Sequence, residues 1–192
     1  MVIHSKHRSA GMAEEQFTAG RTRVGWVGTG VMGFAMCERV QTAGYQITVY
    51  ARTPSKIRGL CEKGAVLVDS PMAVGERRDV IFTMVNDPSD VREVVLGTKG
   101  ILSGVAPGSG TVLVDMTSNQ PSLAREIYEE ARAKGCESVD APVSGADKGA
   151  KDGTLAIMTG GELRLWRSWI PCLGLWDQRL IWGLRAQARV AR

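Results

Sequence analysis

The chain has 192 residues, of which 44% are hydrophobic and 23% are charged, and these are ordinary values for one globular domain. Its net charge of +4 comes from residues 162–192, because residues 1–161 hold equal numbers of basic and acidic side chains. A neutral body and apolar runs too short to cross a bilayer exclude nucleic acids and membranes from the expected partners.

Short β-branched runs alternate with helical stretches along most of the chain. This alternation, with several strands apolar throughout, predicts an α/β fold: a doubly wound, mostly parallel sheet of the Rossmann type, covered on both faces. The expected strands are Val24–Val27, Ile47–Tyr50, Ala65–Val68, Val80–Val85, Thr111–Asp115, Glu137–Asp140 and Leu155–Met158. The expected helices are Val31–Ala43, Ser55–Lys63, Pro71–Gly75, Ser89–Leu96 and Pro121–Lys134.

Residues 1–21 are expected to form a disordered leader. Lys6 and Arg8 resemble the cations of a transit peptide, but Glu14 and Glu15 follow soon after and break that pattern. We therefore expect a cytoplasmic protein, with the mitochondrion or another organelle as the alternative. The four Cys are scattered without the spacing of metal ligands, which predicts a reduced compartment and no metal site.

A glycine-rich segment directly follows the first expected strand and opens the first expected helix. It reads GxGxxG, with glycines at Gly28, Gly30 and Gly33. In a dinucleotide-binding turn, the first glycine permits the tight turn, the second lets a pyrophosphate approach, and the third lets the helix pack on the strand. We expect the turn and the first helical residues to bind the cofactor, namely Gly28, Thr29, Gly30, Val31, Met32 and Gly33.

The end of the second expected strand bears on the choice between cofactors. Enzymes that prefer NAD usually place an acid there for the ribose 2′-hydroxyl, and this chain has Ala51. Arg52, with Thr53 and Lys56, is suited to a 2′-phosphate through charge-assisted hydrogen bonds. We therefore predict NADP, with NAD as the less favoured cofactor.

Two further loops follow strand ends, where ligands of open α/β sheets bind. The first contains Ser118, Asn119 and Pro121, and the second reads Asp-Ala-Pro-Val-Ser-Gly from Asp140 to Gly145. Taken alone, the first loop is also explained as a helix cap and the second as a plain turn.

Together with the fingerprint, these loops resemble the β-hydroxyacid dehydrogenase family, the group of 3-hydroxyisobutyrate dehydrogenase and glyoxylate/succinic semialdehyde reductases. The resemblance runs from about Thr22 to Gly161. It implies that Val85 and Asn86 lie against the cofactor, although the family commonly has Leu-Pro there. It also implies that Ser118 lies near the nicotinamide and the substrate.

The resemblance assigns the substrate carboxylate to Ser144 and Gly145, through a hydroxyl group and a backbone N–H. Ala146 replaces the second glycine of the family's Ser-Gly-Gly, so we expect its methyl group to crowd this loop. The substrate-binding residues expected on these grounds are Ser118, Ser144 and Gly145.

The family's general acid/base is a Lys on the first helix of a C-terminal all-helical domain, with an Asn one helical turn further on. Reduction of a carbonyl needs such a group, because a proton must reach the oxygen. The last Lys of this sequence is Lys151 and the last Asn is Asn119. We therefore expect the all-α domain and a catalytic Lys to be missing, and we interpret Lys148 and Lys151 as solvated loop residues.

The expected domain division is a leader at 1–21, an NAD(P)-binding domain at 22–161 and a tail at 162–192. The tail holds four of the five Trp and six Arg, and we interpret it as foreign to the family, read out of frame or alternatively spliced. An amphipathic helix for a partner is the other interpretation, although Pro171 and Gly174 interrupt its apolar stripe.

The expected function is that of an NADP-binding oxidoreductase domain for hydride transfer between NADP(H) and a small hydroxyacid or semialdehyde. Little turnover is expected from this chain, so its status as an enzyme stays open. The alternative is a catalytically inactive NADP-binding regulator. The expected partners are a small carboxylate substrate and, in homo- or hetero-oligomers, full-length family members.

Overall fold

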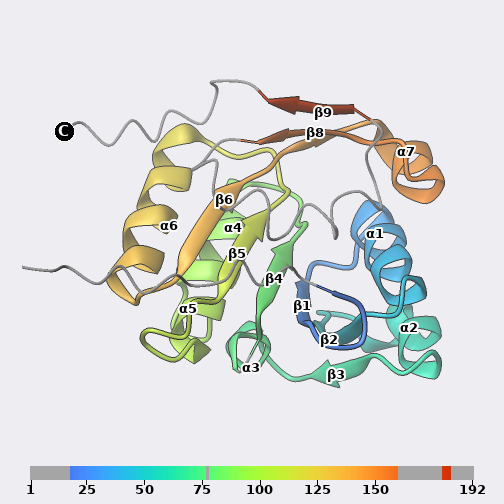
Figure 1. Ribbon diagram of the computed structural model, residues 1–192, viewed down its shortest axis with the longest axis horizontal. Coiled ribbons are helices and arrows are strands. Elements are labelled where there is room, and N and C mark those ends of the chain that lie inside the picture. Colours follow the sequence, from blue (N-terminus) through green and yellow to red (C-terminus); the bar gives the residue numbers. More distant parts are fainter. Residues whose placement is uncertain (1–17, 77, 160–178, 183–192) are drawn as a thin grey trace, which may run out of the picture.

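The computed structural model describes residues 18–76, 78–159 and 179–182, and in them strands alternate with helices (Figure 1). The first half contains β1 (Arg23–Val27), α1 (Val31–Thr42), β2 (Gln46–Tyr50), the 3-10 helix η1 (Pro54–Ile57), α2 (Arg58–Glu62), β3 (Val66–Val68), α3 (Pro71–Gly75), β4 (Val80–Thr83) and α4 (Pro88–Leu96). The second half contains α5 (Ile101–Gly104), β5 (Val112–Asp115), α6 (Pro121–Ala133), β6 (Glu137–Asp140), β7 (Val143–Ser144), α7 (Ala146–Asp152), β8 (Ala156–Thr159) and β9 (Arg179–Trp182).

Six strands form one sheet in the order β3-β2-β1-β4-β5-β6, and every neighbouring pair is parallel. The chain moves outward from β1 to β3, returns, and continues from β4 to β6 on the other side. This reversal between β1 and β4 is the switch point at which α/β sheets bind ligands. The predicted doubly wound parallel sheet is confirmed.

The sheet has a hydrophobic core on each face, because successive side chains of a strand point to opposite sides. On β4, Val80 and Phe82 belong to one cluster and Ile81 belongs to the other. The first cluster packs against α1, α2 and α7, and the second packs against α3, α4, α5 and α6. All four residues of β4 are buried, and three of them form the apolar run Val80–Phe82, which predicts a strand covered on both faces.

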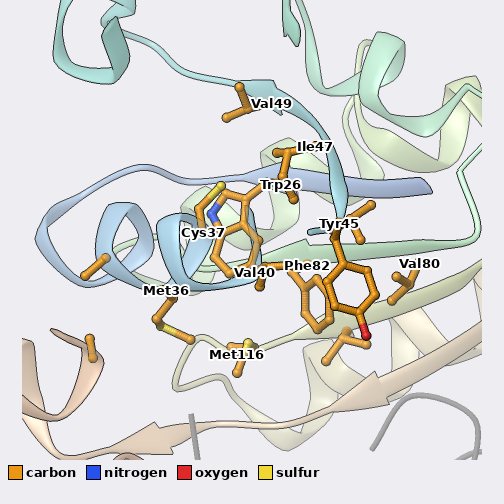
Figure 2. Close-up of a cluster of buried hydrophobic side chains, with 14 of the residues drawn as sticks. Trp26, Met36, Cys37, Val40, Tyr45, Ile47, Val49, Val80, Phe82 and Met116 are labelled. Carbon is orange, nitrogen blue, oxygen red and sulfur yellow. The ribbon is translucent and has the colours of Figure 1, made fainter. Parts of the chain in front are cut away.

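Trp26 lies in the first cluster, next to Phe82, with Met36, Cys37 and Val40 of α1 around it (Figure 2). Its ring centroid is 5.4 Å from that of Phe82. Its indole N–H donates to the carbonyl oxygen of Gly28 at 2.9 Å, so the largest core side chain also braces the turn after β1.

A second, three-stranded sheet has the order β7-β8-β9. Its strands β8 and β9 lie side by side, with α7 near one end of them (Figure 1). β8 pairs antiparallel with β7 and parallel with β9, whose Cα partners run from Arg179 opposite Ala156 to Trp182 opposite Thr159. β9 belongs to the segment that we expected to be a foreign tail. The remainder of that segment, residues 162–178 and 183–192, lies outside the described residues.

The predicted elements differ from the structure mainly at their ends. The expected helix at 55–63 begins as the 3-10 helix η1, and the expected strand at 80–85 ends at Thr83. We did not expect α5, β7, α7 or β9. Residues 1–17 of the expected leader lie outside the described residues, whereas Gly20 already donates its N–H to the carbonyl of Gly44.

No described helix is both long enough and apolar enough to cross a membrane.

Candidate functional site

The turn after β1 has the backbone geometry that a dinucleotide requires. Gly28 has φ +97°, and a Cβ added there would lie 2.1 Å from the carbonyl oxygen of Met84. A Cβ at Gly33 would lie 2.1 Å from the carbonyl oxygen of Gly28, so α1 packs directly on the turn. A Cβ at Gly30 would meet nothing within 4 Å, because this position faces open space. Packing therefore requires glycine at Gly28 and Gly33, whereas Gly30 leaves open space beside the turn.

The N-terminus of α1 is suited to an anion. Gly30 is its N-cap, no side chain caps the helix, and no acidic residue lies in its first turn. The first backbone N–H groups of a helix have no partners within the helix, and its dipole places positive charge at this end. A phosphate group near Gly30 would meet these donors.

A cavity of about 690 Å³ lies beside this turn, at the carboxyl ends of β1, β2, β3 and β4. It brings together seven of the predicted cofactor-binding residues: Gly28, Thr29, Gly30, Arg52, Thr53, Val85 and Asn86. The predicted residues that do not line it are Val31, Met32, Gly33, Ser118, Ser144 and Gly145. Gly33 is buried under the turn, whereas the side chain of Val31 is 70% exposed at the start of α1.

The side of this cavity next to β2 carries positive charge from Arg52 and Lys56. The residue directly after β2 is the buried Ala51, which has no carboxylate to accept a hydrogen bond from a ribose 2′-hydroxyl. The opposite wall is formed by α4, whose Asp90 pairs with Arg52 at 3.3 Å. The cavity therefore contains charges of both signs.

Two groups of residues that line the cavity were not predicted from the sequence. Asp69, Ser70 and Pro71 follow β3, and Gly97, Thr98 and Lys99 follow α4. The signal for the first group was present, because the carboxyl ends of parallel strands meet at the same edge of a sheet. The second group comes from the far end of a helix, and a strand-end argument does not reach it.

The loop after β5 is joined to the cavity by hydrogen bonds. The backbone N–H of Val85 donates to Thr117 Oγ1 at 3.1 Å. Asp115 accepts bonds from Thr83 Oγ1 at 2.7 Å, from the Thr117 N–H at 3.1 Å and from Asn119 Nδ2 at 3.1 Å. Burial raises the pKa of Asp115, and these hydrogen bonds act in the opposite direction. Ser118, between Thr117 and Asn119, is exposed.

The second predicted substrate loop has strained backbone. Gly145 has φ +139° and Ala146 has φ +53°. Ala146 is the one residue other than glycine with positive φ in the described part of the chain. The replacement of the family's glycine therefore places a Cβ in a conformation that L-residues avoid.

We predicted that Lys148 and Lys151 lie in a loop, and this is wrong, because both lie on α7. Each is exposed and pairs with an acid four residues away on the same helix, Lys148 with Asp152 and Lys151 with Asp147. The prediction failed because the glycine-rich sequence does not look helical, whereas Gly153, in the left-handed conformation, ends the helix. Among the described residues, no three His, Cys, Asp or Glu side chains are grouped for a metal.

Known proteins share this sequence and this geometry. Residues 23–183 match the family model of the NAD binding domain of 6-phosphogluconate dehydrogenase. The match continues past Gly161, where we expected the resemblance to end, and includes β9. Over 142 residues the chain is 52% identical to an Arabidopsis thaliana protein named "Probable 3-hydroxyisobutyrate dehydrogenase-like 2, mitochondrial". The aligned region covers 74% of this chain and 47% of that relative.

Solved structures have the same fold. The 3-hydroxyisobutyrate dehydrogenase of Mycobacterium tuberculosis, described with L-serine, aligns with a TM-score of 0.75 and 29% identity over 83% of this chain and 53% of that one. The imine reductase of Myxococcus stipitatus in complex with NADP+ aligns with a TM-score of 0.72 and 25% identity over 83% and 54%. The chain therefore spans about half the length of the relatives it matches.

Proposed function

Because this chain belongs to the β-hydroxyacid dehydrogenase family, as its N-terminal NAD(P)-binding domain, we propose that it binds NADP(H) in the cavity beside the glycine turn. The observation that carries this proposal is the convergence of Gly28–Gly30, Arg52–Thr53 and Val85–Asn86 on one cavity of about 690 Å³. The volume lies within the range of cofactor and ligand sites. The open space at Gly30 is a cradle that a pyrophosphate fits and a side chain would fill.

The residues of the proposed cofactor site have separate tasks. Gly30 and the first turn of α1, with Val31, Met32 and Gly33, would hold the pyrophosphate through backbone donors. Arg52 and Thr53 would hold the 2′-phosphate. Val85 and Asn86 would line the opposite side. The NADP+ in the imine reductase complex shows that a protein of this fold can hold NADP, and a variant of the same enzyme is described with NAD+. The choice of NADP for this chain is supported by Arg52, which lines the cavity next to the buried Ala51.

The proposed reaction is hydride transfer between NADP(H) and a small hydroxyacid or semialdehyde. The cofactor supplies the hydride when bound. Ser118 would lie near the nicotinamide, while Ser144 and Gly145 would hold the substrate carboxylate through neutral donors. All three are exposed at the ends of β5 and β7, where a substrate could reach them. The L-serine described with the tuberculosis enzyme, a small molecule with a carboxylate and a β-hydroxyl, supports this class of substrate.

We further propose that the 192-residue polypeptide by itself turns over slowly. A proton must reach the substrate oxygen, and Lys148 and Lys151 are held in ion pairs on α7. A positioned general acid contributes about 10²–10⁴-fold to a rate. The alternative role is that of an NADP-binding regulator that associates with full-length subunits. The mitochondrial name of the Arabidopsis relative supports the organellar alternative over the cytoplasm.

Titration calorimetry of the purified chain with NADPH and NADH tests the binding proposal. We expect saturable binding of NADPH that is tighter than binding of NADH. Absence of binding to either nucleotide would refute the proposed function. An assay of NADPH oxidation with glyoxylate, succinic semialdehyde and methylmalonate semialdehyde then tests turnover. A rate on the order of 1 s⁻¹, as in working enzymes, would refute the slow-turnover proposal, and co-purification with a full-length homologue would support the regulator.

A further inference from the structure

Asp90 uses both of its carboxylate oxygens to connect two loops of the cofactor cavity. Its Oδ1 lies 3.3 Å from Arg52 Nη1, and its Oδ2 accepts a hydrogen bond from Asn86 Nδ2 at 3.0 Å. All three residues line the same cavity. Arg52 follows β2 and Asn86 follows β4, so a single carboxylate on α4 joins the two sides of the site.

The arginine that we propose for the 2′-phosphate thus already has an anionic partner. The Arg52 side chain is 68% exposed and that of Asp90 is 17% exposed, so Asp90 is the more firmly placed of the two. Arg52 also acts on Asp87. The pKa of Asp87 is lowered chiefly by hydrogen bonds from the Ser89 hydroxyl and the Asp90 backbone N–H, and then by the charge of Arg52. The guanidinium group therefore lies in the field of two acids at the start of α4.

We propose that Asp90 is a specificity-determining residue that competes with the cofactor's 2′-phosphate for Arg52 and so limits the preference for NADP(H) over NAD(H). The inference rests on the proposed cofactor site. To bind the phosphate, Arg52 must leave Asp90 or share its charge with it, and Asp90 then faces a second anion. NADH carries no 2′-phosphate, so it leaves the pair of Arg52 and Asp90 intact.

The size of the effect follows from the exposure of the pair. Exposed ion pairs are weak, and the range measured for them corresponds to at most about a fivefold change in an equilibrium constant. Asp90→Asn keeps the shape of the side chain and its place in the first turn of α4 but removes the charge. We expect this variant to bind NADPH more tightly, by up to about fivefold, with NADH affinity unchanged.

Glu93 provides a matched control on the same helix. Its side chain lines the same cavity one helical turn beyond Asp90 and is exposed, and no ion pair between it and Arg52 is present in the described structure. Glu93→Gln removes the same charge from the same wall. A general repulsion between α4 and the phosphate would make both variants bind NADPH more tightly, whereas competition for Arg52 predicts a clear gain for Asp90→Asn alone.

The experiment measures the Kd of NADPH and NADH by calorimetry for the 192-residue chain and for Asp90→Asn, Glu93→Gln, Arg52→Ala and the double variant Arg52→Ala/Asp90→Asn. In the Arg52→Ala background, the gain from Asp90→Asn should shrink to the level of Glu93→Gln. The gain should also decrease at high ionic strength, because the charges are exposed. Asp90→Ser, which keeps a residue suited to a helix N-terminus, repeats the measurement if Asp90→Asn folds poorly.

Three results would overturn the inference. The first is an equal gain in NADPH binding for Asp90→Asn and Glu93→Gln. The second is unchanged or weaker NADPH binding by both Asp90 variants. The third is weaker NADH binding with unchanged NADPH binding, which would identify Asp90 as the acceptor of a ribose hydroxyl instead of a competitor. Failure of the unmutated chain to bind any nucleotide would refute the proposed function itself, so the two failures are distinguishable.

Discussion

Asp115 and Asp140 are register partners at the carboxyl ends of β5 and β6, which places two carboxyl groups side by side. Asp115 has its hydrogen-bond donors, whereas Asp140 Oδ1 is buried and has no hydrogen-bond partner among the described residues. Burial, and then the charge of Asp115, raise the pKa of Asp140 to about 7. The pair therefore keeps a proton up to neutral pH, and it lies at the start of both proposed substrate loops.

This pair makes stability depend on pH. The pKa of Asp140 is about 7 in the folded chain and about 3.9 in an unfolded one. The folded state binds the proton more tightly, so this contribution is fully present below pH ~4 and is lost as pH rises through about 7. Asp140→Asn should flatten the fall in Tm between pH 5 and pH 8.

Asp152→Asn is the control for that experiment. The pKa of Asp152 is lowered by its bond to Lys148, so Asp152 is ionised in both states across this range. Its replacement should leave the slope of Tm against pH unchanged. If Tm of Asp140→Asn falls between pH 5 and pH 8 as much as that of the parent, the pH dependence arises from other groups.

Asp115→Ala should destabilise the fold, because it removes the acceptor of two buried donors, the Thr83 hydroxyl and the Thr117 N–H. Each buried donor left without a partner costs about 1–3 kcal/mol. Urea unfolding measures the loss. Glu129→Ala, at an exposed position of α6, is the control and should stay within about 0.5 kcal/mol of the parent. A similar small change for Asp115→Ala would show that the loops hold without it.

Gly30→Val should abolish NADPH binding and keep the fold. A valine Cβ has room at this position, since nothing lies within 4 Å, but its branches would occupy the space proposed for the pyrophosphate. Valine is a poor N-cap, so a loss of about 1 kcal/mol in stability is expected. Gly59→Ala, whose Cβ would only touch Phe34 at 3.9 Å, is the control. Normal NADPH binding by Gly30→Val would make the fingerprint a purely structural turn.

Arg52→Ala should remove the preference for NADPH. A hydrogen bond to a charged group contributes about 1.5–3 kcal/mol, and the competing contact with Asp90 favours the lower end, roughly tenfold in Kd. NADH binding should be nearly unchanged. Calorimetry decides, with Arg58→Ala as a control, because Arg58 at the start of α2 does not line the cavity. Equal affinities for the two nucleotides in the parent chain would contradict the assignment of Arg52.

Ending the chain after Gly161 should lower Tm. The deletion removes β9 and leaves the edge of β8 without its parallel partner. Exposed strand edges also promote association between chains, so light scattering should rise. A chain that ends after Gly183 keeps β9 and should retain the parent Tm. An unchanged Tm after Gly161 would mean that β9 adds nothing to the stability of this domain.

The sheet and the glycine turn could be predicted from the sequence because their signals are local. The apolar run Val80–Phe82 and the spacing of Gly28, Gly30 and Gly33 each point to one structure with few competitors. The place of Arg52 at this cavity was predicted in the same way, from its position two residues after the end of β2. These features depend on residues that are close together in the sequence, so they can be predicted from the sequence alone.

The rest depends on contacts between distant segments. Asp90 meets Arg52 across 38 positions, and neither residue signals this contact in its own surroundings. β9 was missed because its backbone pairs with β8, while its Arg- and Trp-rich sequence suggested a foreign segment. α7 was missed because Gly145, Gly149 and Gly153 outweigh its helical residues, and its helix is supported by packing against α1.

Gly28 brings the turn after β1 into backbone contact with Met84 on the loop after β4, with no room between them even for a methyl group. Two loops that touch through their main chains cannot move independently. The cost of ordering them is met during folding, so a nucleotide that enters the cavity does not have to immobilise them again. Affinity at this site should therefore respond little to changes in loop flexibility and strongly to the chemical groups that the cavity presents.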